Sequence, residues 1–272
     1  MMVEQDKYMP DSNRIGLLTS ITLLALALTR IIPSPAFNFE IQLPGFLLTF
    51  PFNINTAMGL LTACLAATGM DWLVRGHPSL NRRPTFQWWF LPTLTTFVIS
   101  VPLSILPDGQ AWWIAFIVSG IFLFFVFLAE YIAVDADAPY YTTSMVGLTA
   151  ISYTLFFILA VALRTSEVRL YLIIPGLFMA ASLASLRILH LRLSGNWEYA
   201  WAVGIGLICI QLATGFYYWP LSPIQFGLLL IGPLYGLVSL AINLGENIPT
   251  RRAVLEPAIV TALCWGLSAF IR

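Results

Sequence analysis

Nine long apolar runs dominate this sequence and restrict its fold more than any other feature. Each run has about the 20 residues that an α-helix needs to cross the hydrocarbon core of a bilayer. Hydrocarbon offers no hydrogen-bond partners, so a segment at that depth must satisfy its own backbone groups as a helix. We therefore predict an all-α polytopic membrane protein with nine transmembrane helices, at 15–32, 55–74, 86–106, 111–134, 144–163, 168–189, 198–218, 224–244 and 253–271.

The composition argues against a soluble domain. Hydrophobic residues make up 59% of the chain and charged residues 10%, whereas a typical soluble domain is about 25% charged. The formal net charge is zero, which argues against nucleic acid as a partner. Cys64, Cys209 and Cys264 lie far apart in apolar runs, so they predict neither a disulfide framework nor a zinc site. The partner that this composition implies is the lipid bilayer.

The basic residues predict the orientation, because cytoplasmic loops carry an excess of Lys and Arg. With a cytoplasmic N-terminus, nine of the 13 basic residues fall on the cytoplasmic side and four on the other. We therefore predict that the N-terminus is cytoplasmic and the C-terminus is outside. We interpret 15–32 as a retained helix rather than a signal peptide, because no small-residue cleavage site follows it.

One segment, 37–54, departs from the helical pattern. Apolar and polar residues alternate along 37–43 and again along 46–52, which is typical of strands with one apolar face. Pro44-Gly45 between them suits a turn. We predict a short β-hairpin outside the cytoplasm, with its apolar side against the helix ends. The alternative is an edge on which a partner docks.

The chain is predicted to form a single transmembrane domain, 1–272, with a possible parallel repeat inside it. The tripeptide Pro-Leu-Ser occurs in Val101-Pro-Leu-Ser104 and again in Trp219-Pro-Leu-Ser222. An acidic loop that ends in proline follows each of them, at 135–139 and at 245–249. These marks predict two four-helix units, 55–164 and 168–272, preceded by an N-terminal helix and hairpin at 1–54. Parallel repeats occur in transporters, but also in proteins that transport nothing.

Three acidic residues form the candidate metal site. Glu130, Asp135 and Asp137 lie within eight residues at the cytoplasmic end of the fourth helix, with no basic residue among them. Carboxylate oxygens are the ligands that hard cations prefer, and a D-x-D pair can also hold a metal–diphosphate. The alternative is a solvated acidic loop in which Glu130 reaches the interface or pairs with Arg187.

Other polar residues inside or beside the helices suggest binding or pairing. Arg187 and His190 share one face of the sixth helix and are a candidate lipid-phosphate site, the alternative being simple anchoring at the cytoplasmic face. Two i,i+4 pairs, Asp71 with Arg75 and Arg252 with Glu256, are predicted to be structural ion pairs.

Gln211 lies in the middle of a helix, and two Pro-Gly combinations, Pro175-Gly176 and Gly232-Pro233, interrupt helical runs. Broken helices can line a substrate site. Proline and glycine are also common in membrane helices that bind nothing, so both interpretations stay open.

Three stretches carry a resemblance to a known family: "AATGMDWLVRGHP", "AEYIAVDADAP" and "YWPLSPIQFGLLLIGPLYGL". In these the chain resembles an uncharacterised family of bacterial multi-pass membrane proteins, along nearly its whole length. The resemblance implies a bacterial plasma (inner) membrane location. It implies no activity, cofactor or site residue.

The sequence contains no Walker A, H-E-x-x-H or G-x-S-x-G motif, so no catalytic residue and no cofactor is assigned. The favoured hypothesis is a non-catalytic scaffold or accessory subunit of a membrane assembly. A carrier or binding protein for a small or lipidic substrate is the alternative. A metal-dependent transferase at the acidic loop is the third.

Overall fold

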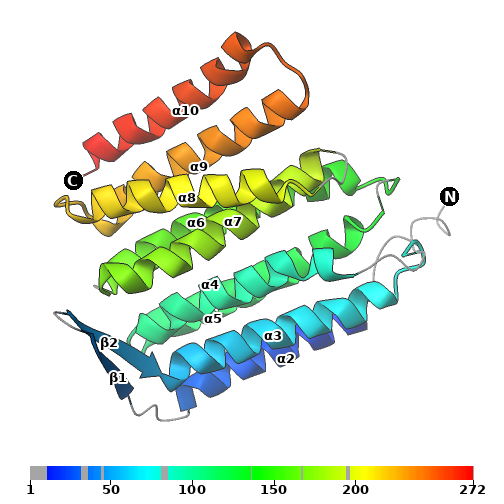
Figure 1. Cartoon of the computed structure of the whole chain (residues 1–272). Helices are drawn as coiled ribbons and strands as arrows, with labels where there is room; N and C mark the ends of the chain where they lie inside the picture. The colour runs from blue at the N-terminus through cyan, green and yellow to red at the C-terminus, as the bar shows by residue number, and fades with distance from the viewer. Residues whose placement is uncertain are drawn as a thin grey trace. The chain divides into compact units, whose positions relative to one another are not determined.

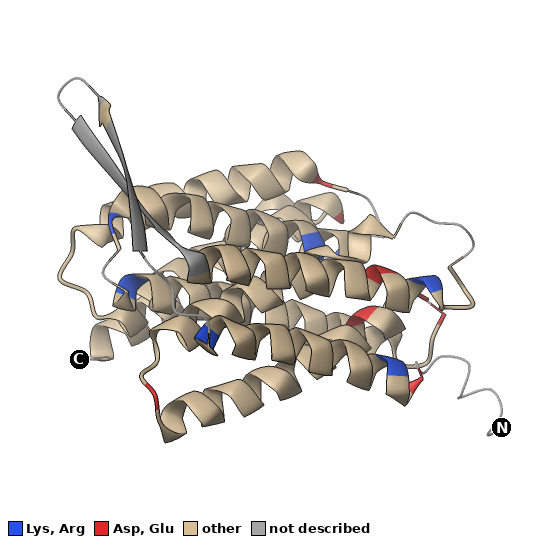
Figure 2. Ribbon diagram, turned by 90° about the horizontal axis from the view of Figure 1, so that it is seen from below, with Lys and Arg blue, Asp and Glu red and all other residues tan. Residues whose placement is uncertain are grey.

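A computed structural model gives the fold of the chain. It describes residues 11–31, 36–43, 46–80, 85–135, 137–166, 168–193 and 197–271. Within these ranges nine helices are long and apolar enough to cross a membrane, which confirms the predicted class of a multi-pass helical membrane protein. Figure 1 shows the helices as long rods, and Figure 2 shows that charged residues occupy only short parts of them.

The helices divide between two compact units, Met1–Asp135 and Ala136–Arg272. The first unit contains α2 (Ser12–Ile31), α3 (Ile54–Arg75), the 3-10 turn η1 (Phe86–Trp88), α4 (Phe90–Ile105) and α5 (Gln110–Ile132). The second contains α6 (Tyr141–Thr165), α7 (Leu170–Arg192), α8 (Tyr199–Tyr217), α9 (Pro223–Gly245) and α10 (Thr250–Phe270). This boundary does not coincide with the predicted repeat units 55–164 and 168–272, and the repeat stays a prediction.

Close helix packing forms the core of the first unit. Leu18 of α2, Met70 of α3 and Phe127 of α5 are buried in one apolar cluster. A Cβ atom at Gly69 would overlap the end of the Leu18 side chain, so glycine at this position gives Leu18 of α2 room to pack on α3. Small residues at such contacts are the usual means by which membrane helices gain van der Waals contact.

The second unit follows the same rule. Ala180, Ala181 and Ala184 of α7 are fully buried. A Cβ atom at Gly206 of α8 would overlap Ser182 and press on Phe178, both on α7. Helices α6, α7 and α9 pack on one another, α8 lies on α7 and α9, and α10 packs on α9.

Two strands lie between α2 and α3. β1 (Ala36–Leu43) pairs with β2 (Phe46–Asn53) in antiparallel register, and the expected arms 37–43 and 46–52 lie within them. The register joins Phe37 to Phe52 and Phe39 to Phe50, so two aromatic pairs occur across the ladder. The predicted turn at Pro44-Gly45 lies outside the described residues.

The predicted interruptions at Pro175-Gly176 and Gly232-Pro233 are wrong, because α7 and α9 continue through them as unbroken helices. A proline inside a helix frees the carbonyl one turn before it. A membrane helix can continue past a proline where neighbouring groups satisfy that carbonyl, and α9 provides an example below.

Candidate functional site

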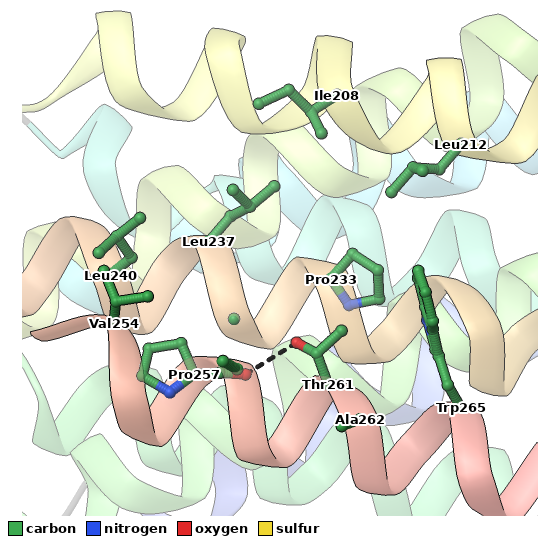
Figure 3. A pocket seen from close by; sticks show the side chains of 12 residues that line it. Ile208, Leu212, Pro233, Leu237, Leu240, Val254, Pro257, Thr261, Ala262 and Trp265 are labelled. Carbon is green, nitrogen blue, oxygen red and sulfur yellow. Dashed lines mark hydrogen bonds between the residues drawn. The ribbon is translucent and has the colours of Figure 1, made fainter.

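A groove opens between α8, α9 and α10 in the second unit (Figure 3). It encloses about 480 Å³. Its walls are almost wholly apolar: Ile208 and Leu212 come from α8, Pro233, Gly236, Leu237 and Leu240 from α9, and Val254, Pro257, Ala258, Thr261, Ala262 and Trp265 from α10. All three helices are candidate membrane spans, so the groove lies within the apolar part of the unit.

A side chain of α10 compensates the proline in α9. Pro233 has no N–H, so the carbonyl of Leu229 lacks its helical donor. The indole N–H of Trp265 donates to that oxygen, with an Nε1–O distance of 3.1 Å. The helix α9 continues through Pro233, and the bond fixes the tryptophan ring as a wall of the groove.

The proline in α10 is compensated in the same way by α9. Pro257 frees the carbonyl of Ala253, and the amide Nδ2 of Asn243 donates to it at 3.1 Å. Asn247 closes the connection between the two helices with a positive φ of 57°, a conformation that asparagine adopts more readily than most residues. The two helices therefore form a mutually hydrogen-bonded pair.

Two glycines set the distance between α9 and α10. A Cβ atom at Gly236 would lie 2.6 Å from Oγ1 of Thr261, and one at Gly232 would lie 3.0 Å from Cβ of Cys264. The spacing G-x-x-x-G is the known motif for close approach of membrane helices. The Thr261 hydroxyl donates to the carbonyl of Pro257 at 2.8 Å and lies 3.0 Å from that of Gly232.

The polar atoms around the groove are thus engaged within the α9–α10 pair. The Thr261 hydroxyl points to the backbone carbonyl of Pro257 (Figure 3). The indole N–H of Trp265 donates to the carbonyl of Leu229. What the groove offers to a ligand is apolar shape with a floor of small residues. Such a surface can bind a hydrocarbon chain or the apolar side of another helix.

An unusual face of α8 borders this groove. Gly204, Ile208, Gln211 and Gly215 are spaced along one side of the helix, and a Cβ atom at either glycine would meet nothing within 4 Å. Gln211 is exposed, although it lies in a candidate membrane span. Among the described residues its amide has no hydrogen-bond partner. Sequence reasoning singled out Gln211, but not its exposure.

The acidic residues of the candidate metal site have different environments. Glu130 is fully buried at the end of α5, with 0% of its surface exposed. Asp135 is partly buried and accepts a hydrogen bond of 2.6 Å from the Ser79 hydroxyl. Asp137 is exposed. Within the described residues no three His, Cys, Asp or Glu side chains form a group that could hold a metal ion. The metal hypothesis stays a prediction.

His77, to which the sequence assigned no role, lies beside Asp135. Its Nδ1 accepts the backbone N–H of Ser79 at 3.1 Å, and its ring packs on Tyr131 with centroids 4.6 Å apart. Burial lowers the pKa of His77, and the nearby Asp135 carboxylate partly opposes this shift. The contact of the His77 ring with Tyr131 and the hydrogen bond of Ser79 to Asp135 fasten the loop after α3 to the end of α5, so we interpret this cluster as structural.

The candidate lipid-phosphate residues lie near the end of α7. Arg187 is buried, with 1% of its surface exposed. His190 stacks on Trp197, with ring centroids 4.1 Å apart and an interplanar angle of 16°. The depth of Arg187 does not favour contact with a lipid phosphate, and that hypothesis too stays a prediction.

One of the two predicted ion pairs is confirmed. Arg75 Nε lies 2.8 Å from Asp71 Oδ2, and the Thr85 hydroxyl donates to the same carboxylate. The predicted ion pair of Arg252 with Glu256 is wrong, because among the described residues it does not form. Glu256 instead accepts a hydrogen bond of 3.1 Å from the Tyr235 hydroxyl on α9. Tyr235 can reach the Glu256 carboxylate in place of Arg252 because α9 packs directly on α10.

Comparison with known proteins agrees with the sequence resemblance. A family model described as a protein of unknown function, DUF5656, matches residues 33–271, nearly the whole chain. No curated protein matches the chain. No solved structure matches it either. From the extent of the family match, this multi-pass membrane protein belongs to the uncharacterised DUF5656 family.

Proposed function

We propose that this chain is a non-catalytic scaffold or accessory subunit of a membrane assembly, and that a transmembrane helix of a partner protein packs on α8 beside the groove. The observation that supports this proposal most strongly is the exposed amide of Gln211. An amide left without a partner in hydrocarbon costs about 2 kcal/mol or more. Lipid tails cannot satisfy it, whereas a polar side chain on a neighbouring helix can.

The surroundings of Gln211 favour a helix as the occupant. Gly204 and Gly215 flank it on the same side of α8, with open space where their side chains would be. Small residues on either side of a polar residue let a second backbone come close enough for an interhelical hydrogen bond. The adjoining groove, lined by Ala258 and Ala262 among others, can receive the apolar side chains of the same helix.

A carrier for a lipidic substrate is the second candidate, because the groove volume and its apolar walls also suit a hydrocarbon chain. A hydrocarbon chain in the groove would, however, leave the Gln211 amide without a hydrogen-bond partner. The metal-dependent transferase at Glu130, Asp135 and Asp137 ranks third, since no group of three metal-ligating side chains occurs in the described part of the chain.

Photo-crosslinking tests the proposed partner helix. We expect a photoreactive amino acid at Ile208, which lines the groove, to capture one protein of defined mass in native membranes. The same probe at Leu263, which is 60% exposed but does not line the groove, serves as the control. Gln211→Leu should abolish the Ile208 product. Crosslinks to lipid alone at Ile208 would support the carrier instead, and crosslinks between two copies would indicate self-association.

We propose that the protein lies in a bacterial plasma membrane with its N-terminus in the cytoplasm, on the strength of the basic-residue bias and the family resemblance. Reporter fusions after Leu80 and after Ile271 should report opposite sides of the membrane, because seven candidate spans separate them. A cytoplasmic signal from both fusions would refute this topology.

We propose further that the β1–β2 hairpin rests its apolar face on neighbouring apolar surface. Phe39→Asp is expected to lower the free energy of unfolding by about 1 to 2 kcal/mol, because it introduces a charge on that face. Asn38→Asp should have little effect, since adjacent residues of a strand point to opposite faces. Chemical denaturation in detergent measures both. Equal losses would contradict a one-sided hairpin.

A further inference from the structure

A second cavity lies where α6, α7, α8 and α9 meet at one end of the second unit. It encloses about 510 Å³ and is lined by Arg164, Thr165, Ile173, Tyr217, Leu221 and Pro223, among others. These residues come from the end of α6, the first turns of α7 and the connection from α8 to α9. Unlike the groove described above, this cavity has a positively charged side chain, that of Arg164, in its wall.

Backbone carbonyls and aromatic rings hold Arg164 in place. Its Nη1 donates to the carbonyl of Tyr217 at 3.1 Å and its Nη2 to that of Trp219 at 3.2 Å. The guanidinium also lies over the rings of Tyr217 and Phe226, 5.1 and 5.7 Å from their centroids. Within the described residues, which omit Glu167, no carboxylate lies within salt-bridge distance of Arg164. Among the described residues its charge is therefore positioned but not neutralised.

Arg30 of the first unit provides a contrast. It too lies in the last turn of a helix and donates to a backbone carbonyl, that of Leu106, at 3.3 Å. There, however, Asp108 pairs with the guanidinium, with an Nε–Oδ1 distance of 2.8 Å. The same kind of helix-end arginine is thus neutralised in one unit, whereas the described residues leave it uncompensated in the other.

The rest of the cavity favours an anion. The first turns of α7 and α9 border it, and the partial positive charge of helix N-termini attracts anions. At α9, Pro223 has no N–H and the N–H of Gln225 is bound by Ser222. Arginine has five N–H donors, of which two make the carbonyl bonds described above. The planar, fork-shaped guanidinium can donate to two oxygens of a phosphate group at once, and it fits a spherical anion less well.

The aromatic residues next to the cavity indicate its depth in the membrane. Tyr218 and Trp219 follow the last turn of α8 and are 75% and 57% exposed. Exposed tyrosine and tryptophan at helix ends are typical of the level of lipid headgroups. We propose that this cavity binds a phosphate group at that level, with Arg164 as its principal ligand, either from a phospholipid headgroup or as free phosphate.

The test measures the thermal stability of the purified full-length protein in detergent with three additives. Phosphatidylglycerol should raise the melting temperature, whereas diacylglycerol, which has no phosphate, should not. An equal rise with inorganic phosphate would identify free phosphate as the source, and a rise with the phospholipid alone would identify the headgroup. No rise with either phosphate compound would overturn the proposal.

Three variants assign the effect to the cavity. Arg164→Gln should weaken the response to phosphatidylglycerol about tenfold in half-maximal concentration. Thr165→Glu, which places a carboxylate at the exposed rim of the cavity while leaving the Arg164 carbonyl bonds in place, should weaken it as well. Arg30→Gln is the matched control and should leave the response unchanged. An unaltered response in both Arg164→Gln and Thr165→Glu would show that the phosphate binds elsewhere.

Discussion

Gly236→Leu is expected to lower the free energy of unfolding by about 3 kcal/mol, the upper part of the range for overpacking a close contact. The first atom of the new side chain would lie 2.6 Å from Thr261 Oγ1 and 3.4 Å from the backbone oxygen of Pro257. The Thr261 hydroxyl is engaged with the carbonyls of Pro257 and Gly232 and cannot turn aside without losing these contacts, so α9 and α10 must separate. Separation also strains the bonds that Trp265 and Asn243 make across the pair.

Gly266→Leu is the matched control for this prediction. Gly266 lies on α10 as well, but a Cβ atom there would meet nothing within 4 Å. Its replacement should be neutral, or stabilising by up to about 1 kcal/mol from helix propensity. Denaturation of both variants in the same detergent compares them directly. Similar losses would show that Gly236 is not at a tight interface.

The second large effect concerns the two carbonyls that prolines release. Trp265→Phe combined with Asn243→Leu removes both side-chain donors, and we expect a loss of about 2 to 4 kcal/mol in the free energy of unfolding. The estimate assumes about 1 to 2 kcal/mol for each carbonyl left without a partner. Each single variant should therefore show roughly half of the total.

Restoring the helical donor tests this explanation specifically. Pro233→Ala gives residue 233 an N–H that can bond the Leu229 carbonyl. In that background Trp265→Phe should cost less than about 0.5 kcal/mol, because the carbonyl then keeps a partner. The double-mutant cycle reports the difference as a coupling energy. A coupling energy near zero would mean that Trp265 contributes only packing.

The class and the helices could be predicted because they depend on local properties. Run length and the absence of hydrogen-bond partners in hydrocarbon require helices, and all nine expected spans occur within the described residues. The pair of Asp71 and Arg75 was equally predictable, since i,i+4 residues are neighbours on any helix.

The predictions that were wrong concern positions whose contacts are made by residues far away in the sequence. Gly232-Pro233 indicates an interruption until the carbonyl that Pro233 releases, that of Leu229, is seen to accept from Trp265, 36 residues further along the chain. Arg252 and Glu256 have the right spacing for an ion pair, but Tyr235 on the adjacent helix takes the carboxylate. Ser79 and Asp135 are 56 residues apart, and no local pattern joins them. These contacts follow from which helices are neighbours, which a single sequence does not state.

The candidate site shows the same division. Gln211 could be identified from the sequence as a polar residue in an apolar run, but such a residue can face a neighbouring helix, a cavity or lipid. Its exposure on α8 depends on which sides of that helix α7 and α9 cover. The groove likewise requires three helices to be in place before Ala262 and Leu212 become its opposite walls.

Native mass analysis of the protein released from its own membrane in mild detergent tests the central claim most directly. We predict a complex of fixed stoichiometry with a second membrane protein. That complex should be lost in Gln211→Leu and in Ala262→Trp, which fills the groove, but retained in Leu263→Trp on another side of α10. The isolated Gln211→Leu chain should be at least as stable as the wild type, because it no longer exposes an unpaired amide. A lone chain, with or without bound lipid, whose mass is the same in all four proteins apart from the substitutions would contradict the subunit hypothesis.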